Sequence, residues 1–370
     1  MLGSLYKKLR NFCDICKRLA VSFYLQCQQP LTDINSNTTF ILFFWNFQIV
    51  QRNEVYFMLT LEKIQAAKLK VAPYIYETPV IRLQGLDELL HCNVSIKAEN
   101  MQKTNSFKLR GALSKLLSMP VAQLQHGVVA ASSGNHGKGV AFAAQLLNIP
   151  ATIVLPDSAP PIKVEGIRAL GARIVQCTLA ERHQVTEALS VEHGYAIVHP
   201  YDDYDIMAGQ GTVALEILEQ FSQVSAIVVP IGGGGLLSGV ATAVKSLAPH
   251  IKIIGVEPAV VPRYSKSIQV GKRLQLAEQK SLADALLTLQ PGERNFPIVE
   301  KLVDDIVRVD EVSILNGMKT LLLEGKILAE PSSAIGIGAA LQGTLPITKN
   351  DHVCFLISGG NIGLNQLQRL

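Results

Sequence analysis

Residues 227–235 read Ile-Val-Val-Pro-Ile-Gly-Gly-Gly-Gly, an apolar run that ends in four consecutive glycines. The run has the length and the β-branched composition of a buried strand, and residues 236–247 have the composition of a helix. Because glycine lacks a Cβ, the backbone of this turn can approach an anion closely and direct its N–H groups toward it. The positive end of the following helix points at the same place. The segment therefore predicts a strand, a phosphate-binding turn and a helix.

Two nucleotide-binding motifs are absent from this turn, and their absence limits the kind of phosphate that it can bind. It has no Lys-Ser or Lys-Thr ending, which a nucleotide P-loop requires, and no GxGxxG spacing followed by an acidic residue for a dinucleotide ribose. A small phosphate monoester is therefore favoured over ATP or NAD. The alternative is a flexible turn without a ligand, but four glycines are costly in chain entropy unless something uses them.

Two further glycine-bearing turns, 132–137 and 358–361, also follow apolar strands. Because ligands of open α/β sheets bind beyond the carboxyl ends of the strands, the three turns predict one site. The two hydroxyls and the amide of residues 132–136 suit a carboxylate, although Ser132 as an ordinary helix cap is the alternative. Short apolar runs alternate with helical segments, so we predict an α/β fold with a mostly parallel sheet. Strands are expected at 94–97, 128–132, 151–155, 173–176, 197–199, 226–230, 253–257 and 353–357, and helices at 61–71, 106–117 (capped by Ser106), 134–147, 161–170, 180–193, 209–221, 236–247, 312–325 and 333–341.

Length and composition set the class of protein. The 370 residues suggest two domains, or one with a lobed insert, and 48% hydrophobic against 17% charged residues is typical of a well-packed globule. The net charge of +4 comes from scattered basic residues, which argues against nucleic-acid binding. Six widely spread cysteines are not a disulfide framework, so a reducing cytoplasm is the expected location.

Residues 1–57 differ in texture from the rest, since they hold the only tryptophan and three of the six cysteines. The apolar run 40–50 is shorter than the roughly 20 residues that span a bilayer, so we expect no membrane segment. Cys13 and Cys16 have the spacing of a metal knuckle, but no second pair completes a site. We interpret 1–57 as a non-native or disordered leader, with the functional chain beginning at Met58.

Residues 103–112, Lys-Thr-Asn-Ser-Phe-Lys-Leu-Arg-Gly-Ala, resemble the cofactor-lysine segment of the serine/threonine dehydratase and serine racemase family. These are fold-type II pyridoxal-phosphate enzymes, related to the tryptophan synthase β chain. The resemblance covers about 300 residues, from Thr78 to Asn361, and includes the three glycine turns and the motifs at 209–212, 255–258 and 330–332. It implies two open, mostly parallel sheets flanked by helices, with a small domain at 118–196 and a large domain formed by 58–117 and 197–370.

The resemblance implies a role for each matching residue. Lys108 would form the internal Schiff base with pyridoxal 5'-phosphate and later act as a base, which requires a pKa lowered by burial or by nearby cations. Ser358, a neutral hydroxyl at the pyridine nitrogen, would leave that nitrogen unprotonated and favour elimination over a long-lived carbanion. Phe107 would pack against the ring and Asn135 would bond its phenolic oxygen. The remaining implied contacts are to the phosphate, from the backbone N–H groups of Gly232, Gly233, Gly234, Gly235 and Leu236, and to the substrate carboxylate, from Ser132, Asn135 and His136.

Two positions depart from the dehydratase pattern. Ser133 stands where the family's racemases have a second acid/base on the face opposite the lysine, so a catalytic role for it keeps racemisation open. Glu257 is retained from the family's divalent-cation site, but Arg263 replaces the acidic ligand, and a guanidinium cannot ligate a cation. We therefore expect no metal ion at this site, and we expect the positive charge of Arg263 to stand where the metal ion would have been.

The expected function is an ammonia-lyase that converts L-threonine or L-serine to 2-oxobutanoate or pyruvate. Only nine residues follow Asn361, so we expect no C-terminal regulatory domain and favour a catabolic enzyme. Serine racemase and a dehydratase of 3-hydroxyaspartate are the enzymatic alternatives, and a sensor that binds the cofactor or an amino acid is the non-enzymatic one. A homodimer is expected from the resemblance alone.

Overall fold

Two sheets organise the chain in the computed structural model, which describes residues 58–132, 134–159 and 161–368. The larger has the strand order β1-β2-β10-β7-β8-β9 and the smaller the order β5-β4-β3-β6. Every strand pair is parallel except β1 with β2, as predicted for α/β units. The strands are β1 (Val80–Arg82), β2 (Asn93–Ala98), β3 (Val128–Ala131), β4 (Ala151–Pro156), β5 (Arg173–Cys177), β6 (Ala196–Ile197), β7 (Ala226–Pro230), β8 (Lys252–Pro258), β9 (Asp305–Val309) and β10 (His352–Ile357).

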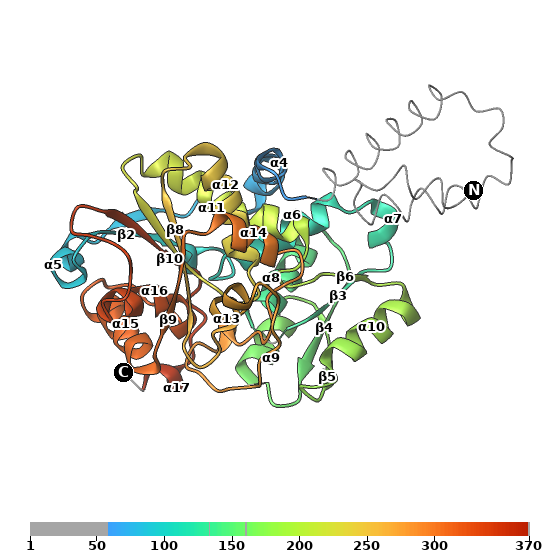
Figure 1. Ribbon diagram of the computed structural model, residues 1–370. Coiled ribbons are helices and arrows are strands. Elements are labelled where there is room, and N and C mark those ends of the chain that lie inside the picture. The colour runs from blue at the N-terminus through green and yellow to red at the C-terminus, as the bar shows by residue number, and fades with distance from the viewer. Residues whose placement is uncertain (1–57, 133, 160, 369–370) are drawn as a thin grey trace, which may run out of the picture. The chain divides into compact units, whose positions relative to one another are not determined.

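Helices flank both sheets (Figure 1). In the part of the chain that the structure describes they are α4 (Leu61–Val71), α5 (Asp87–Leu90), α6 (Lys108–Ser118), α7 (Val121–Leu124), α8 (Asn135–Leu146), α9 (Pro161–Arg168), α10 (Arg182–His193), α11 (Tyr204–Gln220), α12 (Gly235–Leu247), α13 (Arg263–Val270), α14 (Phe296–Leu302), α15 (Glu311–Leu323), α16 (Pro331–Leu341) and α17 (Leu364–Leu367).

The central strand β7 is buried on both faces. Ala226 and Val228 point into a core formed with α15 and α16, whereas Ile227 and Val229 point into a core formed with α11, α12 and α14. Side chains alternate along a strand, so a strand covered by helices on both sides must be apolar at every position. This arrangement explains the unbroken apolar run that precedes the glycine turn.

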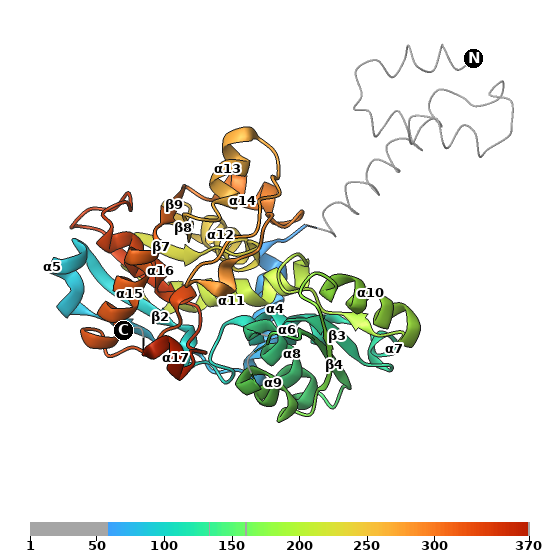
Figure 2. The same cartoon turned by 90° about the horizontal axis from the view of Figure 1, so that it is seen from below.

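Helix α6 packs into the core of the smaller sheet and lies beside α11 (Figure 2). Leu109, Leu113 and Leu116 pack into the core of the smaller sheet. On another face, Arg110 is fully buried between Glu99, next to β2, and Glu216, on α11. The helix that begins with Lys108 is therefore held from two sides.

Some boundaries differ from those predicted. Ser106 does not cap α6: the N-cap is Phe107, without a side-chain cap bond, because Ser106 pairs with Gly359 in an isolated β-bridge. Helix α11 begins at Tyr204 rather than at residue 209, because the Asp203 carboxylate accepts hydrogen bonds from the first turn. Strand β9 at the sheet edge was not predicted, since it carries charged residues at exposed positions.

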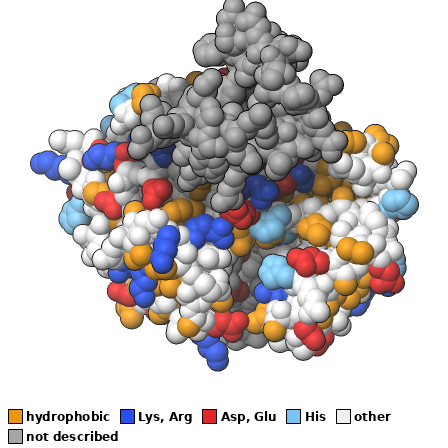
Figure 3. Space-filling model, turned by 45° about the vertical axis from the view of Figure 1, so that its right-hand side comes forward, with side chains coloured by type: hydrophobic (Ala, Val, Ile, Leu, Met, Phe, Trp, Pro, Cys, Tyr) orange, Lys and Arg blue, Asp and Glu red, His pale blue; other side chains and the backbone are white. Residues whose placement is uncertain are grey.

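The surface carries charges of both signs. On the face shown in Figure 3, basic and acidic side chains are interspersed and apolar ones lie between them. Within residues 58–368, apart from the two omitted positions, no helix combines the length and the apolar character that crossing a bilayer requires. The proposed leader, 1–57, lies outside the described residues.

Candidate active site

The glycine turn lies between β7 and α12, and protein donors hold its carbonyl groups on one side. The hydroxyl of Tyr264 donates to Gly233 O at 2.8 Å, and the N–H of Gly292 donates to the same oxygen at 3.0 Å. Arg263 Nη1 donates to Ile231 O, just before the turn, at 2.8 Å. These donors hold the backbone of the turn in place. The N–H groups in the first turn of α12 have no acceptor within their own helix, so they and the N–H groups of the glycine turn can bind an external acceptor.

Packing requires glycine at three of the four positions. A Cβ at Gly233 would lie 2.3 Å from the Tyr201 ring, and one at Gly235 would lie 2.7 Å from Gln210 Oε1. At Gly234, φ is +106°, and a Cβ would lie 1.9 Å from the Tyr264 hydroxyl oxygen. Both amide atoms of the buried Gln210 side chain lack a partner, so polar capacity remains beside the turn. These features fit a phosphate-bearing cofactor.

Lys108 is the first residue of α6 and its amine is partly buried. Its Nζ donates to Pro200 O at 2.6 Å and lies 5.1 Å from the centroid of the Phe107 ring. Burial lowers the pKa of Lys108 to about 8, against the opposing effect of the Glu330 carboxylate. An amine with this pKa is partly neutral near pH 7–8, as a nucleophilic lysine must be.

Asn135 and Glu330 come together beside the third glycine turn. Asn135 Nδ2 donates to Glu330 Oε1 at 2.7 Å, and Asn361 Nδ2 donates to Asn135 Oδ1 at 2.7 Å. A Cβ at Gly359 would lie 2.8 Å from Glu330 Oε1, so this position also requires glycine. The sequence indicated the Glu-Pro-Ser motif but gave Glu330 no role, although an acidic residue at a helix N-cap after an apolar segment was the available signal.

Ser358 follows strand β10 and lies against Ser333 of α16. The two hydroxyl oxygens are 2.9 Å apart, and Ser333 Oγ also accepts from the N–H of Gly359 at 2.7 Å. The N–H of Phe107 donates to Ser358 O at 3.1 Å, which brings the two predicted ring contacts together. If the Ser358 hydroxyl donates a hydrogen bond to a ring nitrogen, the Ser333 hydroxyl can donate one to Ser358 in turn. Ser333 was not predicted.

The groups expected to bind the substrate carboxylate lie at the start of α8. The ring of His136 is buried, and its Nε2 lies 2.8 Å from Val198 O, which can only accept; Nε2 therefore carries the proton. Burial lowers the pKa of His136 to about 3, so the ring is neutral. Carboxylate binding by this residue would therefore use the main-chain N–H in the first turn of α8. Ser132 Oγ accepts from the N–H of Gly134 at 3.2 Å, and Ser133 lies outside the described residues.

His199 is a second histidine near Lys108, half-buried, and the sequence did not indicate it. Its Nδ1 accepts from the N–H of Asp202 at 2.8 Å, and its ring meets the Tyr201 ring edge-on at 4.7 Å between centroids. Burial lowers the pKa of His199 to about 4. Both histidines near the lysine are therefore neutral at physiological pH.

Arg263 lies behind the glycine turn and is fully buried. Besides Ile231 O, its guanidinium donates to the carbonyl oxygens of Leu286 and Thr288, and Nη1 lies 3.5 Å from Glu257 Oε2. The Glu257 carboxylate also accepts from the N–H groups of Tyr264 and Ser265 and from the Ser265 hydroxyl, at 2.6 to 3.0 Å. Its oxygens are thus committed to protein donors, and a cation already faces it. The residues at this position do not fit a divalent cation.

A buried ionic cluster holds α6 through its residue Arg110. Its members are Lys97, Glu99, Arg110 and Glu216. Arg110 binds Glu99 at 2.8 Å and Glu216 at 2.5 Å, and Lys97 binds Glu216 at 2.6 Å. Burial is the largest influence and would raise the pKa of Glu99, but the charges of Arg110 and Lys97 and the hydrogen bonds from Arg110 and Thr78 together outweigh it, so the pKa is lowered. The cluster joins β2, α6 and α11 two residues beyond Lys108.

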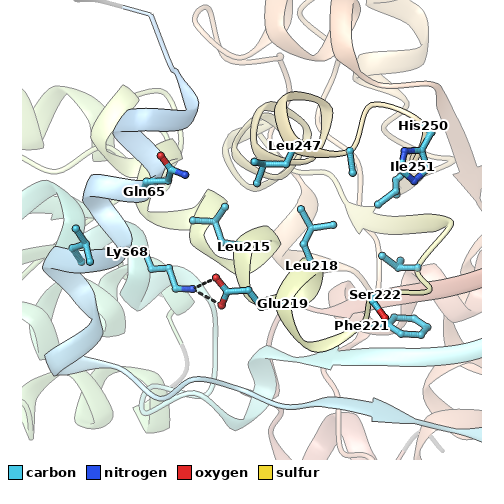
Figure 4. Close-up of a pocket in the computed structure, with 13 residues that line it drawn as sticks. Gln65, Lys68, Leu215, Leu218, Glu219, Phe221, Ser222, Leu247, His250 and Ile251 are labelled. Atoms are coloured by element: carbon cyan, nitrogen blue, oxygen red, sulfur yellow. Dashed lines mark hydrogen bonds and ion pairs between the residues drawn. The ribbon is translucent and has the colours of Figure 1, made fainter.

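A cavity of about 650 Å³ opens at a different place, between α4, α11 and α12 (Figure 4). Leu215, Leu218 and Leu247 line it, and Lys68 pairs with Glu219 within it. It contacts the residues that precede β7 and β8, so it lies at the amino ends of these strands. The glycine turn is at their carboxyl ends, and this apolar cavity is not part of the candidate site.

Comparison with known proteins identifies the family and the fold. Residues 71–359 match the family described as pyridoxal-phosphate dependent enzyme. The chain is 39% identical over 315 residues to an L-threonine ammonia-lyase of Thermotoga maritima, covering 85% of this chain and 78% of that protein. The fold is similar to that of maize serine racemase, with a TM-score of 0.80, 36% identity, and coverage of 84% of this chain and 96% of that one. It is also similar to the T.th. threonine deaminase, with a TM-score of 0.78, 41% identity, and coverage of 82% of this chain and 99% of that one.

Proposed function

The chain belongs to the family of pyridoxal-phosphate dependent enzymes, and we propose that it is an ammonia-lyase for L-threonine and L-serine. The products would be 2-oxobutanoate or pyruvate, together with ammonia. The observation that carries the substrate class is the similarity to L-threonine ammonia-lyase over 85% of the chain. The lowered pKa of Lys108 and the close packing that requires glycine at 233–235 support the choice of cofactor.

When bound, the cofactor supplies an electron sink for the charge left on the substrate Cα. The chain's own residues would hold it: Lys108 by covalent attachment, residues 232–236 at the phosphate, Asn135 at the ring oxygen and Ser358 at the ring nitrogen. Once the substrate's amine has replaced it, the freed Lys108 Nζ would take the proton from Cα. Loss of that proton and of the β-hydroxyl removes one water, and hydrolysis of the resulting enamine adds one water and releases ammonia, so the atoms balance.

The neutral hydroxyls at the end of β10 support elimination. Ser358 and Ser333 carry no charge, so neither favours a protonated ring nitrogen as a carboxylate would. An unprotonated nitrogen withdraws fewer electrons, which shortens the life of a carbanion at Cα and favours prompt departure of the β-hydroxyl.

The test is an assay of 2-oxo acid and ammonia from L-threonine, L-serine and 3-hydroxyaspartate, with Lys108→Ala as the inactive control. We expect L-threonine and L-serine to be consumed and Lys108→Ala to be inactive. Turnover by Lys108→Ala, or no 2-oxo acid from either amino acid with wild type, would refute the proposal.

Serine racemase is the second candidate, because the fold is similar to maize serine racemase and Ser133 matches the racemases' second acid/base. D-serine formed from L-serine would support it. Ser133→Ala should then lose racemisation while retaining elimination, since Lys108 alone serves the latter.

We also propose the protein's metal independence, its location, its small domain and its oligomeric state. We propose a metal-independent enzyme, because Arg263 and protein donors surround Glu257. Cys92, Cys177 and Cys354 are free thiols, which supports a location in the cytoplasm. We propose the small domain at 118–196 because it contains the smaller sheet apart from Ile197, the last residue of β6. We propose a homodimer by resemblance to the family. Light scattering of the purified protein tests the dimer.

A further inference from the structure

A chain of hydrogen bonds, here called the amide relay, runs from Lys138 through Asn361 and Asn135 to Glu330. Lys138 Nζ donates to Asn361 Oδ1 at 2.9 Å, and Asn361 Nδ2 donates to Asn135 Oδ1 at 2.7 Å. Asn135 Nδ2 donates to Glu330 Oε1 at 2.7 Å. The relay joins α8, the segment after β10 and the start of α16 across the candidate site.

Each link of the amide relay has only one possible direction. The Lys138 ammonium group can only donate, so Asn361 must present its oxygen to it and its NH₂ group to the other side. The carbonyl oxygen of Thr104, which can only accept, receives the same Asn361 NH₂ group at 2.9 Å and fixes it independently. Asn135 must therefore present its oxygen to Asn361 and its own NH₂ group to Glu330, whose ionised carboxylate can only accept.

This direction matters because a side-chain amide has two orientations of nearly equal shape. Asn135 Nδ2 carries two hydrogens, and Glu330 uses one of them. In the observed orientation the second hydrogen is available to an acceptor such as the cofactor's ring oxygen. In the reversed orientation Asn135 would present an oxygen to both acceptors.

We propose that Lys138 is a positioning residue that, together with the Thr104 carbonyl group and Glu330, sets the direction of the Asn135 amide and so directs an N–H group to the cofactor's ring oxygen. Lys138 lies three residues after Asn135 on α8, so both side chains are on the same side of the helix. It is half-buried, and burial lowers its pKa. The inference rests on the proposed cofactor but not on the reaction that the enzyme catalyses.

The experiment measures the affinity for pyridoxal 5'-phosphate and the absorption band of the bound cofactor, without any amino acid. Lys138→Met removes the donor at similar size, Lys138→Arg retains a group that only donates, and Lys103→Met is the matched control. Lys103 is partly buried nearby but faces the Tyr76 ring and lies outside the amide relay.

We expect Lys138→Met to bind the cofactor roughly two- to tenfold more weakly, the effect of one hydrogen bond of ordinary strength. Its absorption band should also shift, because a lost donor to the ring oxygen favours the protonated form of that oxygen. Lys138→Arg and Lys103→Met should match wild type. Wild-type affinity and absorption in Lys138→Met would overturn the proposal, and so would an equal loss in Lys138→Arg, which would indicate packing instead of direction.

Asn361→Asp provides a second variant of nearly identical shape. The substituted carboxylate still accepts from Lys138, but it presents an acceptor to Asn135 in place of a donor and would force the Asn135 amide to reverse. We expect a larger loss of cofactor affinity than in Lys138→Met, with thermal unfolding of the cofactor-free protein confirming that it folds. Unchanged affinity in Asn361→Asp would overturn the proposal. Absence of ammonia release by wild type would refute only the proposed function.

Discussion

The amine of Lys108 donates a hydrogen bond of 2.6 Å to the carbonyl oxygen of Pro200, which follows the last strand of the smaller sheet. This bond can form whether the amine is charged or neutral, whereas burial penalises only the charged form. The contact therefore holds the side chain in place without requiring that it be protonated. The pKa of about 8 follows from burial, which the Glu330 carboxylate opposes only in part.

The rate at which the cofactor-free protein takes up pyridoxal 5'-phosphate should rise with pH and level off above about 8. Attachment requires the neutral amine, and Lys108 becomes neutral as pH rises through its pKa. Stopped-flow absorbance across pH 6–10 measures this. A rate that keeps rising up to about pH 10.4, the pKa of an ordinary lysine, would contradict the burial argument.

Replacing Lys108 by Met should stabilise the cofactor-free protein at pH 7. The folded-state pKa of about 8 lies below the unfolded value of about 10.4, so the unfolded chain binds more protons between these limits. The free energy of unfolding of the wild type therefore rises with pH between about 8 and 10.4. Below about pH 8 the buried amine is charged, so burial then lowers stability by its full amount. Thermal unfolding at pH 7, 9 and 10 measures the difference, which should shrink as pH rises. Equal melting temperatures of Lys108→Met and wild type at pH 7 would count against it.

Gly234→Ala should abolish or greatly weaken cofactor binding, by at least tenfold. The added Cβ would lie 1.9 Å from the Tyr264 hydroxyl oxygen at a φ of +106°, so the turn must move. Gly171→Ala is the matched control, because Gly171 also has a positive φ, +79°, but no atom lies within 4 Å of its Cβ position. Fluorescence titration with pyridoxal 5'-phosphate compares them. Equal affinity in the two variants would show that the turn does not hold the phosphate.

Arg110→Met should lower the free energy of unfolding by about 3–5 kcal/mol, because it leaves two carboxylates buried without their main partner. Arg82→Met breaks an exposed pair with Asp87 and should cost less than about 1 kcal/mol. Urea unfolding of both variants measures the difference. Similar losses in the two variants would mean that burial adds nothing to the cluster.

Chelators should leave the activity unchanged, and added Mg²⁺ should not raise it, because the Arg263 guanidinium faces Glu257 at 3.5 Å. In Arg263→Asp, an acidic side chain would replace that positive charge, so activity should fall and Mg²⁺ should restore part of it. Steady-state assays with and without EDTA test both variants. Strong activation of the chelated wild type by Mg²⁺ would refute metal independence.

The parallel core and the glycine turns could be predicted from the sequence because local pattern determines them. The run from Ala226 to Pro230 is apolar throughout, and this identified the central strand to the residue. Glycines at 233–235 signalled a turn, and the close contacts with Tyr201, Tyr264 and Gln210 explain why no other residue fits there.

Contacts between distant segments could not be predicted in this way. Glu330, Ser333 and His199 reach the site through the tertiary fold, and no short-range pattern links them to Lys108, which is far from each of them in the sequence. From the sequence, Arg263 was identified only as the residue that replaces an acidic metal ligand. Its contacts with the carbonyl groups of residues 231, 286 and 288 depend on a loop whose path has no sequence signature.

The two neutral histidines beside Lys108 have a consequence for acid tolerance. Their pKa values are lowered to about 3 and about 4, so neither ring gains a proton when the surroundings acidify from neutrality to about pH 5. Ordinary histidines, with a pKa near 6.5, would become cationic in that interval and repel the lysine. We expect these two rings to stay neutral, and to keep the hydrogen bonds that depend on this, when the pH falls to about 5. Exposed imidazoles would become charged over the same range and change their hydrogen bonds.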